Sequence, residues 1–193
     1  MGNLVIISGP SGVGKGTIIN KLKEKYQSEN KKLYVSVSYT TRSPRTGEEN
    51  GKDYYFISTE EFQKLIKNNG LLEYNEYGTG KYYGTPKDMI FNYIDNGYDV
   101  ILEIDVNGYQ KIKELNLPLT SIFVAPPSMD ELEKRLRSRN SESDDIINKR
   151  LKEASKEIMK MNDYNYVVFN ENGKIDEAVN SIYDLMNRKK YIK

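Results

Sequence analysis

The sequence contains no cysteine and no histidine. Without cysteine the chain can form no disulfide, hold no zinc ion through thiolates and use no thiol nucleophile. Without histidine it lacks the commonest general base and every imidazole metal ligand. Its chemistry must therefore depend on lysine, arginine, carboxylates, hydroxyl groups or a metal ion that arrives with a substrate.

Long apolar runs and an excess of one charge are also missing. No run approaches the roughly 20 apolar residues that a membrane-spanning helix needs, and the first residues lack the features of a signal peptide. The net charge is +1, from 29 basic and 28 acidic residues, which gives no overall attraction to nucleic acid. We expect a cytoplasmic protein, monomer or homodimer, that binds small molecules and neither nucleic acid nor a membrane.

Short apolar runs alternate with segments in which apolar residues recur every three or four positions. The runs predict strands at 4–7, 34–37, 100–104, 121–124 and 166–169. The periodic segments predict helices after residue 15, from 128, over 147–161 and from 175, with Ser128 and Glu131 as a capping box. Strands that alternate with helices indicate an α/β fold with a parallel sheet flanked by helices.

Residues 38–97 break this alternation. They contain tyrosine-rich strand patterns, a helix pattern over 59–69, and a second one that begins at Thr85-Pro86 and closes at Asn96-Gly97. We interpret them as an inserted mixed α/β lobe, and the polar stretch 137–145 as part of a mobile helical lid. The expected organisation of the single domain, 1–193, is a core at about 1–37, 98–136 and 162–193, the lobe at about 38–97 and the lid at about 137–161.

A glycine-rich loop links the first predicted strand to the first predicted helix. It fits the pattern G-x-x-x-x-G-K, and its position between strand and helix is the context that this phosphate-binding motif requires. Glycines let backbone N–H groups surround an anion, the helix adds its positive end, and Lys15 adds a charge. The predicted contacts to ATP phosphates are Gly9, Pro10, Ser11, Gly12, Val13, Gly14, Lys15, Gly16 and Thr17. The alternative is a plain turn before an ordinary helix.

The segment 36–54 resembles the signature of guanylate kinases and reads SVSYTTRSPRTGEENGKDY. Further segments are similar to that family in the same order along essentially the whole chain, namely 9–17, 82–85, 103–108, 125–128 and the later arginine-rich helices. Members of the family transfer the γ-phosphate of ATP to GMP, and their fold has a P-loop core, a GMP-binding lobe and a lid. The resemblance implies this activity and makes 38–97 the GMP-binding lobe.

The resemblance also implies Mg²⁺ as the cofactor that accompanies ATP, because the ion neutralises charge on the transferring phosphoryl group. The P-loop pattern usually has a metal-binding hydroxyl directly after its lysine. Here Gly16 follows Lys15, and the hydroxyl comes one residue later, at Thr17. The protein ligands of the metal therefore stay open.

By the resemblance, Arg42 and Arg45 hold the GMP phosphate together with the hydroxyls of Tyr54 and Tyr83, and Arg45 also stabilises the transition state. Guanidinium groups suit this task because their N–H donors match phosphate oxygens in pairs. The alternative for these arginines is a solvated basic loop.

Glu73 is the residue that bears on the choice of base. Guanine presents N1–H and N2–H₂ donors on one edge, and a carboxylate can accept from both, whereas adenine would leave it unpaired. The resemblance adds guanine contacts from Ser38, Thr85 and Asp105. From the residues alone, Glu73 could face solvent, and Asp105 could orient the water around a metal ion or cap the next helix.

Arg135, Arg139 and Arg150 match the family's lid arginines, which bridge the donor and acceptor phosphates. With Lys15 and Arg45 they form the expected catalytic set. Phosphoryl transfer depends on alignment and charge compensation and needs no general base here, so the absence of histidine is no obstacle. Asn170 resembles a position near the ATP adenine.

Three other functions stay open. The first is a nucleoside monophosphate kinase with another acceptor, but the segment 36–54 and Glu73 favour GMP. The second is a non-catalytic guanylate-kinase-like binding module, but such modules typically have a degraded P-loop and this one is intact. A P-loop switch that only hydrolyses ATP leaves the lobe residues without a task.

Overall fold

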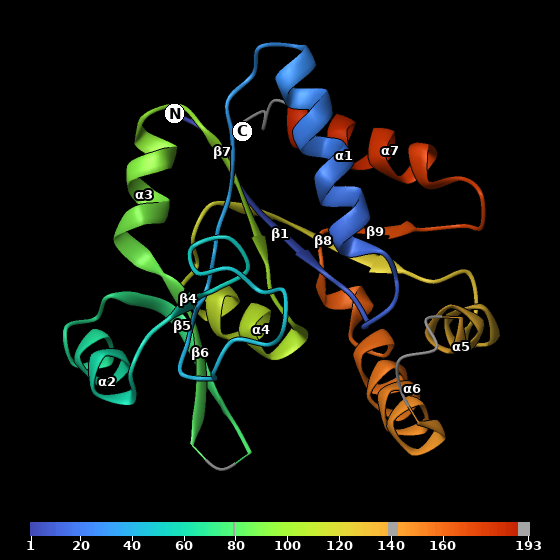
Figure 1. The fold of residues 1–193 in the computed structure, drawn as a ribbon. Helices are drawn as coiled ribbons and strands as arrows, with labels where there is room; N and C mark the ends of the chain where they lie inside the picture. Colours follow the sequence, from blue (N-terminus) through green and yellow to red (C-terminus); the bar gives the residue numbers. More distant parts are fainter. Residues whose placement is uncertain (79, 139–142, 189–193) are drawn as a thin grey trace. The chain divides into compact units, whose positions relative to one another are not determined.

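The computed structural model describes residues 1–78, 80–138 and 143–188 (Figure 1). Its strands are β1 (Leu4–Ser8), β2 (Leu33–Val35), β3 (Tyr39–Thr40), β4 (Tyr55–Phe56), β5 (Leu71–Tyr77), β6 (Lys81–Pro86), β7 (Asp99–Glu103), β8 (Leu119–Ala125) and β9 (Tyr166–Phe169). Its helices are α1 (Lys15–Ser28), α2 (Thr59–Lys67), α3 (Lys87–Asp95), α4 (Val106–Glu114), α5 (Met129–Arg137), α6 (Asp144–Ile158) and α7 (Ile175–Asn187), with a 3₁₀ turn at Met161–Asp163.

The chain divides into two compact units. Unit 1 contains residues 1–4 and 32–118, and unit 2 contains residues 5–31 and 119–193. These boundaries differ from the core, lobe and lid expected from the sequence, which stay predictions. The phosphate-binding loop belongs to unit 2, and the whole segment 36–54 belongs to unit 1.

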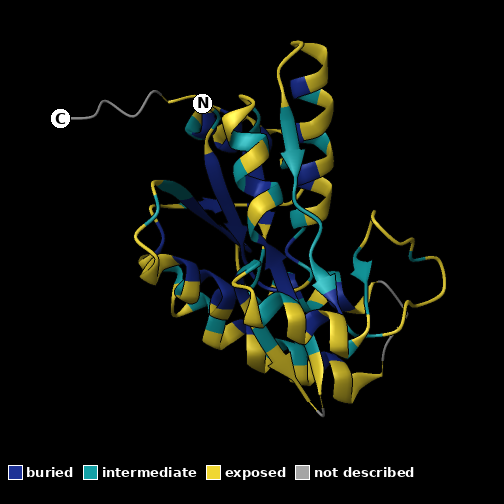
Figure 2. Cartoon of the chain, turned by 90° about the vertical axis from the view of Figure 1, so that its left-hand side faces the viewer, coloured by how far each residue is buried: buried dark blue, intermediate teal, exposed yellow. Residues whose placement is uncertain are grey.

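The larger sheet has the strand order β2-β7-β1-β8-β9. Within unit 1, β2 runs parallel to β7, and within unit 2, β8 runs parallel to β9. Every residue of β1 is buried, as in strands covered on both faces. Figure 2 shows the buried residues of the chain in dark blue. In unit 2, α1 packs beside α7 (Figure 1). The predicted parallel sheet flanked by helices is confirmed, and all five predicted strands are present.

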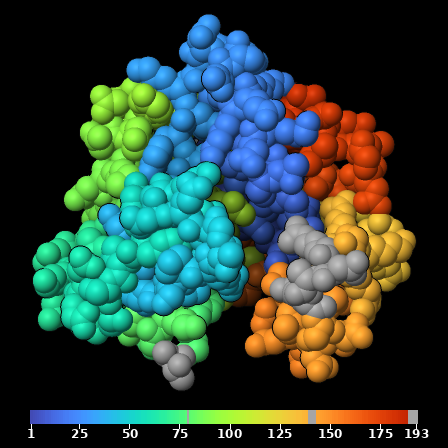
Figure 3. Space-filling model, in the orientation of Figure 1, coloured from blue at the N-terminus to red at the C-terminus, as the bar shows by residue number. Residues whose placement is uncertain are grey.

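A smaller, mixed sheet lies in unit 1, with the order β4-β3-β6-β5. The hairpin of β5 and β6 is antiparallel and places Glu73 opposite Thr85, while β3 pairs antiparallel with β6 and parallel with β4. Helix α2 covers part of this sheet, because its fully buried Phe62 ring stacks on Tyr82 at 5.3 Å. In Figure 3 the segment from β3 to β6 forms the cyan-to-green surface.

The predicted capping box at the start of α5 is only half formed. Ser128 Oγ accepts from the Glu131 backbone N–H at 3.2 Å, but the Glu131 carboxylate accepts from Lys134 and Asn172. A complete capping box begins α2, where Ser58 and Glu61 each accept from the other's backbone N–H.

None of the described helices has the length and apolar composition that crossing a membrane requires.

The turn from β1 into α1 depends on glycine. Gly9 has φ +147°, and a Cβ atom there would lie 2.2 Å from the carbonyl oxygen of Val124 in β8. Gly14 caps α1 with φ +101°, and its Cβ would lie 2.6 Å from Asn170 Nδ2. L-residues with side chains rarely adopt these angles. The loop can therefore lie this close to Val124 and Asn170 only if positions 9 and 14 are glycine.

We expect Gly9→Ala to lower the free energy of unfolding by about 1–3 kcal/mol, the usual cost of forcing an atom into a packed site. Urea unfolding measures the change. Gly16→Ala is the matched control, since a Cβ at Gly16 meets nothing within 4 Å inside α1, and its effect should be neutral or slightly stabilising. Equal stability of the two variants would contradict this account of the turn.

Candidate active site

In unit 2 the phosphate-binding loop folds around the Lys15 side chain. Lys15 Nζ donates to the carbonyl oxygens of Gly9 at 2.7 Å and Pro10 at 3.3 Å. The ammonium group is therefore held over the loop, next to the first turn of α1. A cation and helix-terminal N–H groups together form a favourable environment for phosphate oxygens.

Two side chains donate hydrogen bonds to the carbonyl oxygen of Val13 in this loop. Asn170, buried after β9, donates to it from Nδ2 at 2.8 Å, and Arg135 of α5 donates from Nη1 at 3.4 Å. Arg135 Nη2 also donates to the Asn170 carbonyl at 2.7 Å and to Asn172 Oδ1 at 2.6 Å. Asn170 and Arg135 thus hold the loop in position in this structure.

Arg150 of α6 also reaches the loop, where its Nη1 donates to Ser11 Oγ at 2.9 Å. The structure thus brings Arg135, Arg150 and Asn170 to the P-loop. Arg139 lies outside the described residues. Thr17 is exposed on α1, two residues after the lysine.

Unit 1 contains a pocket of about 360 Å³ beside the hairpin of β5 and β6. Residues from β5, β6 and the end of β7 dominate its wall. The lining comprises Ser38, Tyr54, Glu73, Asn75, Tyr77, Tyr83, Gly84, Glu103, Ile104, Asp105 and Gly108. Five of the side chains predicted to bind GMP therefore line one pocket.

Glu73 is the buried acid of this pocket, with an exposed fraction of 8%. Thr85, buried on the neighbouring strand, donates from Oγ1 to Glu73 Oε1 at 2.5 Å, and Asn75 donates from Nδ2 to Oε2 at 3.3 Å. Burial raises the pKa of Glu73, although the Thr85 hydrogen bond opposes this shift. The carboxylate has lost much of its water and is stabilised by any further donor that enters the pocket. The solvent-facing alternative for Glu73 is wrong.

Asp105 has two partners. Its Oδ1 accepts from the backbone N–H of Gly108 at 2.8 Å and so caps α4, which is one of the alternatives that the sequence leaves open. Its Oδ2 accepts from the Tyr77 hydroxyl. Burial and this hydrogen bond raise the pKa of Tyr77. Asp105 therefore lines the pocket with a fixed orientation while it also caps a helix.

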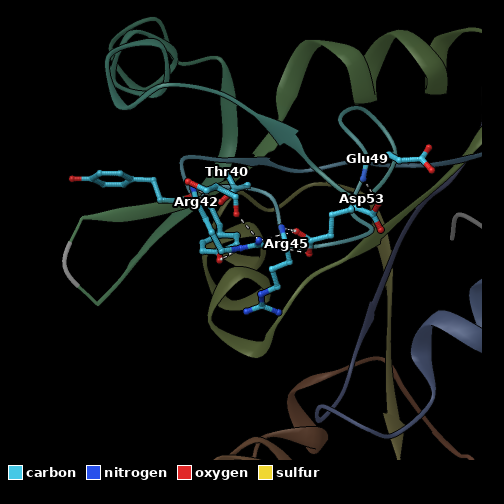
Figure 4. Close-up of polar contacts among 9 residues, drawn as sticks. Thr40, Arg42, Arg45, Glu49 and Asp53 are labelled. Carbon is cyan, nitrogen blue, oxygen red and sulfur yellow. Dashed lines mark hydrogen bonds and ion pairs between the residues drawn. The ribbon is translucent and has the colours of Figure 1, made fainter. Parts of the chain in front are cut away.

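The loop after β3 carries the two arginines of the 36–54 segment (Figure 4). The Arg42 guanidinium forms an ion pair with Glu48 at 2.7 Å and donates from Nε to the Tyr83 hydroxyl at 3.1 Å. The Arg45 guanidinium makes no hydrogen bond or ion pair with the residues that the structure describes, and in Figure 4 it extends away from the loop. The two arginines, which the sequence places together in the phosphate site, have different surroundings.

Sequence reasoning did not identify Asn75, Tyr77, Glu103 and Gly108 as part of the pocket. For Asn75 and Tyr77 a signal exists, because they follow Glu73 at every second position and alternate residues of a strand share a face. Gly108 belongs to the pocket because of its place in space: a Cβ there would lie 3.2 Å from Glu73 Oε2. The sequence gives no signal for this contact.

The sequence model of the family described as guanylate kinase matches residues 1–189. Curated relatives with that name include the protein of Lactobacillus johnsonii, 49% identical over 88% of this chain and 81% of its own. Another is the protein of Clostridium tetani, 45% identical over 98% of this chain and 87% of its own.

A crystal structure of guanylate kinase from Anaplasma phagocytophilum is also similar. It is 35% identical, has a TM-score of 0.72, and the match covers 96% of this chain and 84% of that one. Together with the P-loop and the intact 36–54 segment, these similarities settle the relationship. The chain belongs to the guanylate kinase family of ATP:GMP phosphotransferases.

Proposed function

We propose that this chain binds GMP in the pocket around Glu73, binds the phosphates of ATP on residues 9–17, and transfers the γ-phosphate between them. The observation that carries the proposal is the buried Glu73 carboxylate, which faces a pocket of about 360 Å³. A desolvated acid in such a pocket favours a ligand that presents hydrogen-bond donors.

Guanine is the natural base with two adjacent donor groups on its pairing edge. The Glu73 carboxylate accepts from N1–H and N2–H₂, and hydrogen bonds from Thr85 and Asn75 keep the carboxylate in place. Ser38 and Asp105 line the same pocket and complete the base site. Adenine presents an acceptor at N1 and would leave the buried carboxylate unpaired, which explains the expected preference.

The GMP phosphate is proposed to lie between the Arg45 guanidinium, Arg42 and the hydroxyls of Tyr54 and Tyr83. Arg45 supports this role because its donors are not committed to other described residues. The ring of Tyr54 lies 5.8 Å from that of Tyr83, centre to centre, and both side chains line the pocket.

Transfer requires the γ-phosphorus and a GMP phosphate oxygen to meet in line, with compensation for the charge on both phosphates. We assign this compensation to Lys15, Arg45, Arg150, Arg135 and Arg139, the last of which the structure does not describe. The GMP phosphate is already an anionic nucleophile, so no side chain needs to remove a proton from it. We also assign the segment 137–161 to a lid that closes over bound nucleotides.

Mg²⁺ is proposed to arrive with ATP and to neutralise charge on the phosphoryl group. Among the described residues, no group of three or more acidic side chains could hold a metal ion alone. That fits Mg²⁺, which usually keeps several waters and binds through substrate phosphates. The exposed Thr17 hydroxyl is the group we propose to contact its water shell. Both substrates belong to the cytoplasmic nucleotide pool, where we propose that the chain acts.

Lys15→Ala should lower kcat by about 10²- to 10³-fold, the usual loss for one transition-state donor, without unfolding the chain. Coupled ADP formation with ATP, GMP and Mg²⁺ measures it. Lys21→Ala is the control, because Lys21 lies further along α1 and pairs with Asp176 of α7 at 2.9 Å. Near-normal turnover in folded Lys15→Ala would remove the P-loop from the mechanism.

Glu73→Gln should lower kcat/KM for GMP by about 10- to 100-fold, since the amide N–H₂ would oppose a guanine donor. The value for AMP should change much less, so the GMP:AMP ratio falls. The ratio is measured with both acceptors supplied separately, and Glu76→Gln, exposed in the same strand, serves as the control. If the ratio is unchanged, Glu73 does not select the base.

The same substitution should stabilise the nucleotide-free protein at pH 7. Because burial raises the folded-state pKa of Glu73, its ionised form is penalised, and stability falls as the pH rises through that pKa. The penalty is absent below the unfolded-state pKa. Thermal unfolding should therefore show Glu73→Gln as the more stable protein at pH 7, with the difference fading towards pH 4. A difference independent of pH would contradict this explanation.

A further inference from the structure

The Arg42 side chain is almost fully occupied by the protein itself. Its Nε donates to the Tyr83 hydroxyl at 3.1 Å, its Nη1 to the Ser43 carbonyl at 2.8 Å and to Glu48 Oε2 at 2.7 Å, and its Nη2 to Glu48 Oε1 at 2.9 Å. A guanidinium group has five N–H donors, so these contacts leave one for a ligand. Arg42 alone cannot grip a phosphate with a pair of donors in this arrangement.

Glu48 is the residue that fixes this arrangement. Both of its oxygens face the Arg42 guanidinium, and Oε2 also accepts from the backbone N–H of Arg45 at 2.7 Å. The Arg42 hydrogen bonds, followed by that from Arg45, lower the pKa of Glu48 to about 2, so the carboxylate is charged at neutral pH. The Glu48 side chain thus connects the Arg42 guanidinium to the backbone N–H of Arg45.

The effect reaches the pocket through Tyr83. Because the Tyr83 oxygen accepts from Arg42 Nε, its own hydrogen is directed away from Arg42 and can be donated elsewhere. The Tyr83 ring also packs edge-on against Tyr54 and Tyr77, which line the same pocket. The orientation of Arg42 therefore determines the direction of a hydroxyl donor on the pocket wall.

We propose that Glu48 is a positioning residue for the acceptor phosphate: it orients Arg42 and Tyr83 and holds the backbone of Arg45, whose guanidinium makes the main contact. This inference rests on the proposed function, because it concerns the phosphate of GMP. Glu48 itself does not touch the substrate. Its negative charge is offset by Arg42, which leaves the positive charge of Arg45 for the phosphate.

A competing role for Glu48 is to occupy the phosphate site and leave when GMP binds. The bond to the Arg45 N–H argues against it, since a departing carboxylate would release the loop backbone at the moment when Arg45 must be held. The two roles predict opposite changes in GMP affinity when the carboxylate is removed.

The test is Glu48→Gln, assayed for KM of GMP, KM of ATP and kcat. Glutamine keeps the size but has only one acceptor oxygen, so it faces an N–H donor of Arg42 or Arg45 with its own N–H₂. We expect KM for GMP to rise by about tenfold or more, with KM for ATP unchanged and kcat affected less. Glu49→Gln is the matched control, because Glu49 is exposed in the same loop and its carboxylate pairs, among the residues that the structure describes, with Lys52 alone, at 3.4 Å.

A double-mutant cycle separates positioning from a general effect on folding. If Glu48 acts largely through Arg42, then Glu48→Gln in an Arg42→Ala background should raise KM for GMP by less than about threefold more. An unchanged or lowered KM for GMP, or equal rises for GMP and ATP, would each overturn the proposal, and full additivity of the two changes would overturn the part of it that acts through Arg42. If the wild-type chain fails to phosphorylate GMP, the proposed function fails. If the wild type phosphorylates GMP and Glu48→Gln has the same KM for GMP, only this inference fails.

Discussion

The burial of the Glu73 carboxylate is the constraint on which the rest of the pocket in unit 1 depends. The register of β5 and β6 places Thr85 opposite Glu73, so that a buried hydroxyl can donate to the acid. Beside them, a Cβ on Gly84 would lie 2.8 Å from the Phe62 ring and 3.0 Å from Leu71, so the hairpin can pack on α2 only with glycine there. Gly108 allows α4 to approach the carboxylate in the same way. Strand register and helix packing thus both accommodate a buried carboxylate. Its ionised form is unfavourable there as long as no ligand donates to it.

The sequence predicts the fold well because its signals are local. Unbroken apolar runs such as 4–7 mark strands buried on both faces, and the glycine-rich loop has its expected strand and helix on either side. The 36–54 segment gives the family without any structure. The errors have a physical cause: the capping box was expected at Ser128, where Glu131 has the alternative partners Lys134 and Asn172. One competitor stands three residues later and the other 41 residues later, and both lie outside the four-residue pattern that predicts the box.

The site residues that escaped prediction are those whose roles depend on a partner distant in the chain or on the face of a strand. Tyr77 gains its role from Asp105, 28 residues later, and Asn75 gains its role because it shares a strand face with Glu73. Glu48 stands six residues after Arg42, and only the turn between them brings the carboxylate back to the guanidinium. A motif shows which residue types occur together, but the assignment of donors to acceptors requires coordinates.

The same distinction applies to the arginines of both units. Arg42 is bound by Glu48, Ser43 and Tyr83, and Arg135 is bound by Val13, Asn170 and Asn172, whereas Arg45 has no such bonds to the described residues. An arginine that binds carbonyls and carboxylates of its own chain gives rigidity to a loop and keeps little donor capacity for a ligand. An uncommitted arginine does the opposite, since its charge and donors stay free for a phosphate but its rotamers are not fixed. The proposed phosphate site contains both kinds and so combines a preorganised frame with an available charge, because Glu48 links the Arg42 guanidinium to the backbone of Arg45.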